Sequence, residues 1–131
     1  MTRTEGWEQL LNDHIERARD LVFQWGTTDC ALWCAEWVTI ATGEDFAEPW
    51  RGRYESEVEL NALLVAMDLT GPADIADLAL PRVAVAFAQR GDVVLWQNGL
   101  GICNGTHSHF LTERGVTRAR TRDCTAAWQV R

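Results

Sequence analysis

The chain has 131 residues, of which 47% are hydrophobic, and a formal net charge of -7. This length and composition fit a single domain, residues 1–131, with one hydrophobic core. The negative charge argues against a nucleic-acid partner, because phosphate contacts require clustered lysine or arginine. Long apolar runs are missing, and the N-terminal stretch "MTRTEGWEQLLNDH" is polar and acidic, so we expect neither membrane insertion nor a signal peptide.

An amphipathic first helix is expected over residues 3–19. Thr2 and Glu5 have the spacing of a capping box, and apolar residues then recur at helical intervals. His14 lies on the apolar face of this pattern, where a histidine is more often packed than catalytic. We therefore assign no function to His14.

A second helix, residues 30–42, is expected at the centre of the fold. It follows the turn "WGTTD", in which Thr28 or Asp29 is the predicted N-cap, and Gly43 is the predicted C-cap. The helix is apolar on all sides, which is typical of a buried helix. Three tryptophans are predicted to fill the core around it and to close the sheet: Trp33, Trp37 and Trp128.

The rest of the chain changes from a helical to an extended pattern. Ser56 and Glu59 form a capping box for a third helix, and residues 73–89 read as a short helix followed by an extended or helical piece. After residue 91, short apolar or alternating runs are separated by glycine turns, as in an antiparallel meander. The order predicts an α+β domain whose sheet packs on the central helix.

Cys30 is the main candidate for chemistry, because it lies in the first turn of the central helix. Free backbone N–H groups and the helix dipole stabilise a thiolate there, and the same groups can form an oxyanion hole. The alternative is a small buried core residue, which is the more common role of cysteine. Cys34, one turn later on the same helix, is interpreted as core packing.

The four cysteines also raise the questions of disulfides and of metal. A chain of this length with seven tryptophans does not need disulfides, so reduced thiols are expected. A zinc site would combine cysteines with His107 and His109, but the sequence has no Cys-x-x-Cys knuckle. We therefore expect no metal and no other cofactor.

Several motifs resemble those of a known family. The stretches "WGTTDCALWCAEWV", "RGDVVLW" and "LGICNG" are similar to the NlpC-type peptidases, papain-like cysteine hydrolases of bacterial cell walls. With "TGEDFAEPWRGRY" and the final "AAWQV", the set is similar to a small NlpC-like family of phage and prophage tail modules. The resemblance covers residues 23–130. It implies a papain-like fold, synthesis in the cytoplasm and a place in the virion tail. The partners it implies are tail-tip proteins, with bacterial peptidoglycan as a further candidate.

The resemblance also assigns residues to a site. Cys30 corresponds to the nucleophile, and Trp25 and Asp29 are implied to contact the substrate. Asp92, in the Gly-Asp turn, has a structural role in the family. The general-base histidine of the peptidases falls on Gly99, which we expect to open the second strand after an Asn-Gly turn and to project toward the cysteine.

His107 and His109 are the remaining candidates for a displaced base. Strand alternation points both side chains to one face, and Cys30 can lie at that face. The third polar residue of the peptidase active site, after the cysteine and the histidine, corresponds to Leu111 in this sequence. Two hypotheses stay open: a tail assembly component with a degenerate site, which the loss at Gly99 favours, or a hydrolase that cleaves peptidoglycan stem peptides through a cysteine thioester.

Overall fold

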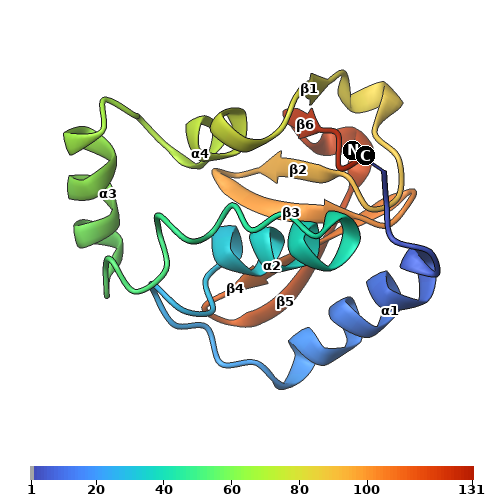
Figure 1. Cartoon of the computed structure of the whole chain (residues 1–131), viewed down its shortest axis with the longest axis horizontal. Coiled ribbons are helices and arrows are strands. Elements are labelled where there is room, and N and C mark those ends of the chain that lie inside the picture. The colour runs from blue at the N-terminus through green and yellow to red at the C-terminus, as the bar shows by residue number, and fades with distance from the viewer. Residues whose placement is uncertain (1) are drawn as a thin grey trace.

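Helices come first and most strands follow, which confirms the predicted α+β class (Figure 1). The computed structural model describes residues 2–131. The helices are α1 Trp7–Arg17, α2 Cys30–Thr42, α3 Glu57–Ala66 and α4 Pro72–Ala79. The strands are β1 Arg82–Val83, β2 Val93–Trp96, β3 Gly99–Cys103, β4 His107–Thr112, β5 Gly115–Arg120 and β6 Ala126–Trp128. Short 3₁₀ turns follow α1, β1 and β5.

The six strands form one open antiparallel sheet in the order β1-β6-β2-β3-β4-β5. The predicted meander holds from β2 to β5, while β6 returns to pair with β2, and β1 adds a strand before residue 91. The ladder between β3 and β4 consists of Ile102 with His109 and Cys103 with Ser108. In this register Leu100 of β3 lies opposite Leu111 of β4, although these two residues are beyond the last paired residues of the ladder.

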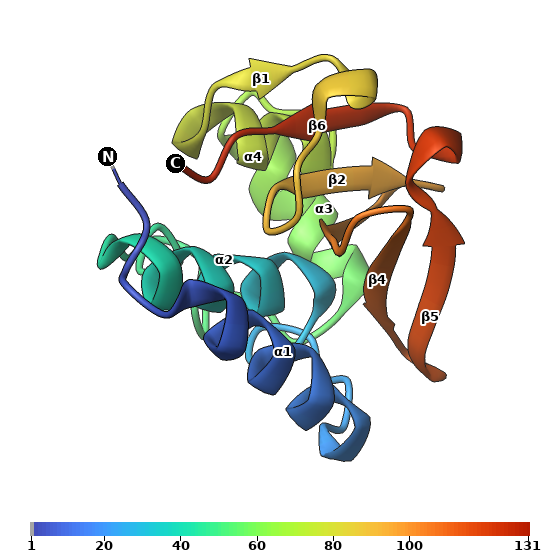
Figure 2. The same ribbon diagram turned by 90° about the vertical axis from the view of Figure 1, so that its right-hand side faces the viewer.

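Helix α2 is the central element of the fold. Its N-cap is Asp29, whose side chain accepts a hydrogen bond from the Leu32 N–H, and its C-cap is Gly43 in the left-handed region. It packs against β3, β4 and α1, which lies on the same side of the sheet (Figure 2). The predicted tryptophans are 0–1% exposed and so belong to the core: Trp33, Trp37 and Trp128.

The first helix is shorter than the predicted range of 3–19. Gly6, with a left-handed φ of 77°, takes the N-cap position that the capping box assigned to Thr2. The residues before Gly6 contact the last turn of α2 instead. The Thr4 N–H donates to the Ala41 carbonyl at 2.6 Å, so this segment is fixed by a tertiary contact rather than by helix formation.

The two later helices agree with the sequence pattern. Ser56 caps α3 by accepting a hydrogen bond from the Glu59 N–H at 3.1 Å. Residues 73–89 give all but the first residue of α4, strand β1 and a 3₁₀ turn, as the mixed pattern predicted. Helix α3 lies at the edge of the molecule and packs inward through Leu60 and Leu64 (Figure 1). Among the described residues, no helix has the length and apolar character needed to cross a bilayer.

Asp92 joins the two ends of the chain. Its buried carboxylate accepts hydrogen bonds from the Arg3 and Arg131 guanidinium groups, at 3.1 and 2.8 Å. It also accepts from the backbone N–H groups of Gln89 and Val130, at 2.9 and 3.1 Å. The terminal segments consequently lie side by side in both views (Figures 1 and 2). Asp92 has the structural role that the sequence predicts.

Candidate functional site

Cys30 is the first residue of α2, as predicted, and it lies in a cleft of about 210 Å³. The cleft opens where β3 and β4 separate beyond their short ladder. Trp25, which the resemblance assigns to substrate contact, is part of its wall. The other lining residues include aromatic or apolar side chains, Phe23, Trp96, Leu100, Phe110 and Leu111, and polar ones, Glu57, Gln97, Thr112 and Glu113. The cleft can therefore accept an apolar group, and it has a thiol at its inner end.

The surroundings of Cys30 favour the neutral thiol. Part of the residue faces the cleft, but protein atoms enclose the sulfur on its other sides. Burial raises the pKa of the Cys30 thiol to about 11, and the negative charge of Asp29 adds to the rise. Backbone hydrogen bonds at Leu100, Ala31 and Cys30 itself act in the opposite direction without cancelling burial. The position at the helix N-terminus therefore does not make this cysteine a thiolate at neutral pH.

Asp29 supports the start of α2 and does not face the cleft. It is 1% exposed, and its carboxylate accepts from the N–H groups of Leu32 and Gly26, both at 3.0 Å. The Tyr54 hydroxyl donates to the same carboxylate at 2.6 Å. All of these partners are structural. In this structure Asp29 holds the turn, the helix and the following loop together, and the substrate contact implied for it stays a prediction.

The Trp-Gly turn before α2 requires glycine at position 26 for steric reasons. Gly26 adopts a left-handed φ of 84°, and a Cβ at this position would lie only 1.9 Å from the Tyr54 carbonyl oxygen. Only glycine allows the loop that carries Tyr54 to approach so closely. The sequence pattern does not predict that Tyr54 packs against the turn and binds Asp29. The sequence feature that points to Tyr54 is its position at the end of "WRGRY".

His107 and His109 do not line the Cys30 cleft. Both share the α2 side of the sheet, as alternation predicts, because His109 is directly opposite the core residue Ile102. They precede Leu111 in β4, and Leu111 is the strand residue on that face that lines the cleft. Burial, and then Arg118 and His107, lower the pKa of His109. Neither imidazole is therefore placed in the lining of the cleft that holds Cys30, and the catalytic role considered for the two histidines stays a prediction.

The third histidine, His14, is a core residue. It is 3% exposed, and its ring stacks on Trp33 with centroids 5.1 Å apart. Its Nε2 lies 3.0 Å from the Trp33 carbonyl oxygen, so this nitrogen carries the proton and donates it. Burial lowers the pKa of His14. The packing role expected from the sequence is confirmed.

Gly99 opens β3 and borders the Cys30 cleft, as expected, but the turn before it differs from the prediction. The two residues with left-handed φ are Gln97 and Asn98, at 48° and 61°, so the hairpin turn is Gln97-Asn98 rather than Asn98-Gly99. Gly99 pairs with Trp96 and shares its face of the sheet. A side chain at position 99 would therefore start on the face opposite α2.

The strand positions that do face Cys30 are apolar. Leu100 and Leu111 belong to the core on the α2 side, and both line the cleft. The Leu100 backbone also forms a hydrogen bond with the Cys30 sulfur. The strand residues Gly99, Leu100 and Leu111, which line the cleft, therefore carry no imidazole.

The remaining cysteines give no second site. All four are free, as expected, and Cys34, Cys103 and Cys124 are buried. Burial raises the pKa of Cys34 and of Cys124. Within residues 2–131, no group of three or more histidine, cysteine or acidic side chains is arranged to hold a metal ion.

The fold and the site define an α+β domain with a cysteine at the start of a buried helix, where burial raises the thiol pKa, in a partly apolar cleft. Residues 2–130 match the family model described as "Domain of unknown function (DUF6950)". The chain therefore belongs to this family. No curated protein matches it.

Proposed function

We propose that this chain is a papain-like domain of NlpC type that does not hydrolyse peptide bonds and serves as an assembly component of a phage or prophage tail. The ordered motifs from "WGTTDCALWCAEWV" to "AAWQV" support the fold and the tail context. The antiparallel sheet packed on a helix that begins with a cysteine is consistent with that fold.

The lack of hydrolytic activity is supported by one observation above all: Cys30 faces Leu100 and Leu111 and no imidazole among the described residues lines its cleft. With a pKa of about 11, roughly one thiol in ten thousand is ionised at neutral pH. Amide cleavage also needs a proton donor for the leaving amine. No imidazole among the described residues lines the cleft to act as base or as proton donor, and the titratable side chains that line it besides Cys30 are Glu57 and Glu113.

A second candidate function is a cysteine peptidase that acts on peptidoglycan stem peptides. It is favoured by the place of Cys30 as the first residue of α2 at the wall of a cleft, where backbone N–H groups of the first helical turn are free of intrahelical partners. In that reaction the Cys30 sulfur attacks the amide carbonyl, the amine leaves with a proton, and water hydrolyses the thioester. An external imidazole or a rearranged cleft would have to supply the proton transfers.

Purified cell-wall peptidoglycan separates the two functions. We expect the chain and its Cys30→Ser variant to release no new amino groups above the buffer level. Hydrolysis by the wild type that disappears in Cys30→Ser would establish the peptidase instead. For the tail role, the chain should be found by mass spectrometry in purified tails of the phage or prophage that encodes it, and its absence from them would contradict that role.

A further inference from the structure

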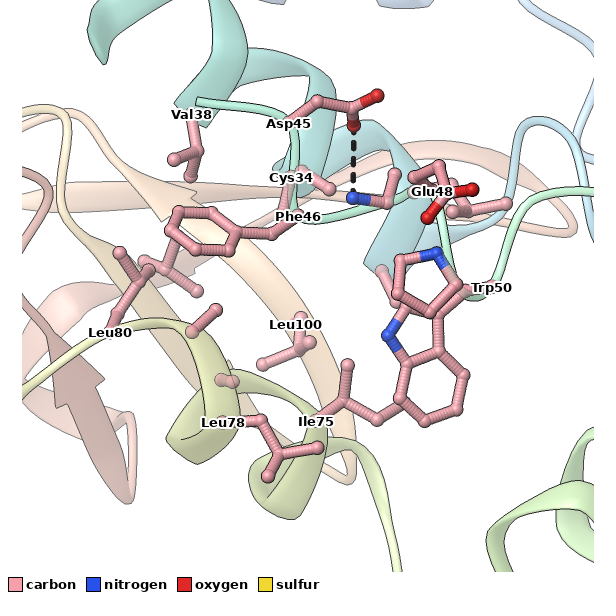
Figure 3. A pocket seen from close by; sticks show the side chains of 18 of the residues that line it. Cys34, Val38, Asp45, Phe46, Glu48, Trp50, Ile75, Leu78, Leu80 and Leu100 are labelled. Carbon is pink, nitrogen blue, oxygen red and sulfur yellow. Dashed lines mark hydrogen bonds between the residues drawn. The ribbon is translucent and has the colours of Figure 1, made fainter. Parts of the chain in front are cut away.

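A larger cavity, of about 290 Å³, lies on the other side of Leu100 from the Cys30 cleft. Its walls come from α2, the loop of residues 45–50, α4 and the first sheet residues beneath them (Figure 3). Most of the side chains that line it are apolar or aromatic, and they include Leu32, Phe46, Trp50, Tyr54, Ile75 and Leu80. The cavity is large enough for one or two bulky apolar side chains.

The loop that forms the mouth of the cavity is held in place. The Asp45 carboxylate accepts a hydrogen bond from the Ala47 N–H at 3.0 Å, which Figure 3 shows as a dashed line. The Trp50 N–H donates to the Ala47 carbonyl at 2.9 Å, and the Trp50 side chain is 6% exposed. Since these contacts are local and satisfied, the cavity is preformed rather than dependent on a ligand.

The mouth combines negative charge with exposed apolar surface. Asp45 is paired with Arg51 at 3.3 Å, whereas Glu48, which lies near Trp50 at the mouth, forms no ion pair with any described residue (Figure 3). Met67 and Leu78 also line the cavity and are 42% and 64% exposed. Exposed large apolar side chains beside a preformed cavity are typical of a binding surface.

The apolar lining and the negative charge at the mouth indicate which kind of molecule this cavity can bind. A fatty acid or a phospholipid carries its negative charge next to its apolar chain, and Glu48 together with the net charge of -7 would repel it. A polypeptide segment with a bulky apolar side chain flanked by lysine or arginine has the complementary arrangement. We propose that this cavity binds such a segment of a partner protein, which gives the proposed assembly role a site separate from Cys30.

The probe for this inference is a blocked peptide with a leucine-phenylalanine pair between lysines, titrated into the isotope-labelled chain. Nitrogen-proton NMR spectra should show shifts at the Trp50 indole and around Ile75 and Leu78, and none at Cys30. A matched peptide with glutamates in place of lysines should bind at least about tenfold more weakly. Glu48→Lys should weaken binding of the basic peptide about five- to tenfold.

The control variant is Glu5→Lys, which makes the same charge change at an exposed position before α1. It should change the affinity less than about twofold. Ala79→Trp, which places an indole in the cavity wall, should abolish binding if the spectrum shows that the variant is folded. Equal binding of both peptides, equal effects of the two lysine variants, or shifts at Cys30 instead of Trp50 would overturn the inference.

Binding of a lipid surface or of a second copy of this chain would each give a distinct NMR result, and either result would overturn the inference. Phosphatidylglycerol vesicles that shift the Trp50 signal, with no effect of the basic peptide, would identify a lipid surface as the occupant. Shifts of the same signals with chain concentration alone would identify a second copy of this chain. The peptidoglycan assay of Cys30 is independent of all these readings, so a failure of this inference and a failure of the proposed silent site are distinguishable.

Discussion

Cys30 and Asp29 are adjacent in the sequence, yet their side chains have unrelated tasks. The Asp29 carboxylate is turned inward and saturated by Gly26, Leu32 and Tyr54, whereas the Cys30 sulfur borders an apolar cleft. Helix-dipole stabilisation of a thiolate amounts to only about 1 kcal/mol, which is smaller than the cost of charging a buried thiol. Burial therefore decides the state of Cys30.

The position of Cys30 was predictable because the Asp-Cys pair is a local N-cap signal. The direction of residue 99 was not predicted correctly, because it depends on cross-strand pairing. Gly99 pairs with Trp96, and the Val93 and Leu95 side chains of β2 pack on the α2 side, so position 99 lies on the opposite face. The shared face of His107 and His109 was predicted correctly, but not their distance from the cleft.

His14 gives the fold a pH dependence at the residue scale. Burial lowers its pKa in the folded chain below the value of about 6.5 expected when unfolded. Between these two values the unfolded chain binds more protons, so stability falls as pH drops below about 6.5. His14→Gln, which keeps a donor for the Trp33 carbonyl, should reduce this loss in urea titrations at a series of pH values. His109 has the same sign of shift and remains in the variant. An unchanged pH profile would show that His14 is not the group involved.

At the scale of elements, α2 is the best predicted part of the fold and α1 the worst at its start. The apolar composition and both caps of α2 are local features, and each of them is present in the structure. The start of α1 depends on a contact between Thr4 and Ala41, which are far apart in the sequence. A tertiary hydrogen bond of this kind overrides a capping-box pattern and cannot be inferred from spacing.

Trp37 tests the central position of α2. It is fully buried, and its indole N–H donates to the Gly91 carbonyl at 2.8 Å. Trp37→Ala should lower the free energy of unfolding by about 3–5 kcal/mol. The control is Val58→Ala on α3, where the side chain is 78% exposed and the change should stay within about 0.5 kcal/mol. Comparable urea midpoints for the two variants would mean that α2 is not the core of the fold.

At the scale of the whole molecule, long-range pairing determines what the sequence pattern leaves open. The helix-then-strand order predicts the class, but the return of β6 to β2 and the addition of β1 join segments that are distant in the chain. The Gly-Asp turn identified Asp92 as structural. Its partners Arg3 and Arg131, at opposite ends of the sequence, become visible only in the fold.

Asp92 should therefore be a main support of the assembled chain. Asp92→Asn leaves two buried or half-buried arginine groups without their carboxylate, and we expect a loss of about 3–5 kcal/mol of unfolding free energy. The control is Asp123→Asn, which removes the exposed ion pair with Arg120 and should cost no more than about 1 kcal/mol. Calorimetry or urea unfolding gives both values, and similar losses would show that the termini are not held through Asp92.

The central claim, that the site of Cys30 is catalytically silent, is tested most directly by the pH dependence of its alkylation. The rate of iodoacetamide labelling, followed by mass spectrometry of the Cys30 peptide, should stay low at neutral pH and rise only toward pH about 11, with circular dichroism confirming that the chain stays folded. Burial should keep the labelling of Cys34 slower still. A fast rate that is already constant above about pH 6, and that slows in His109→Ala, would contradict the account and show a working thiolate–imidazole pair.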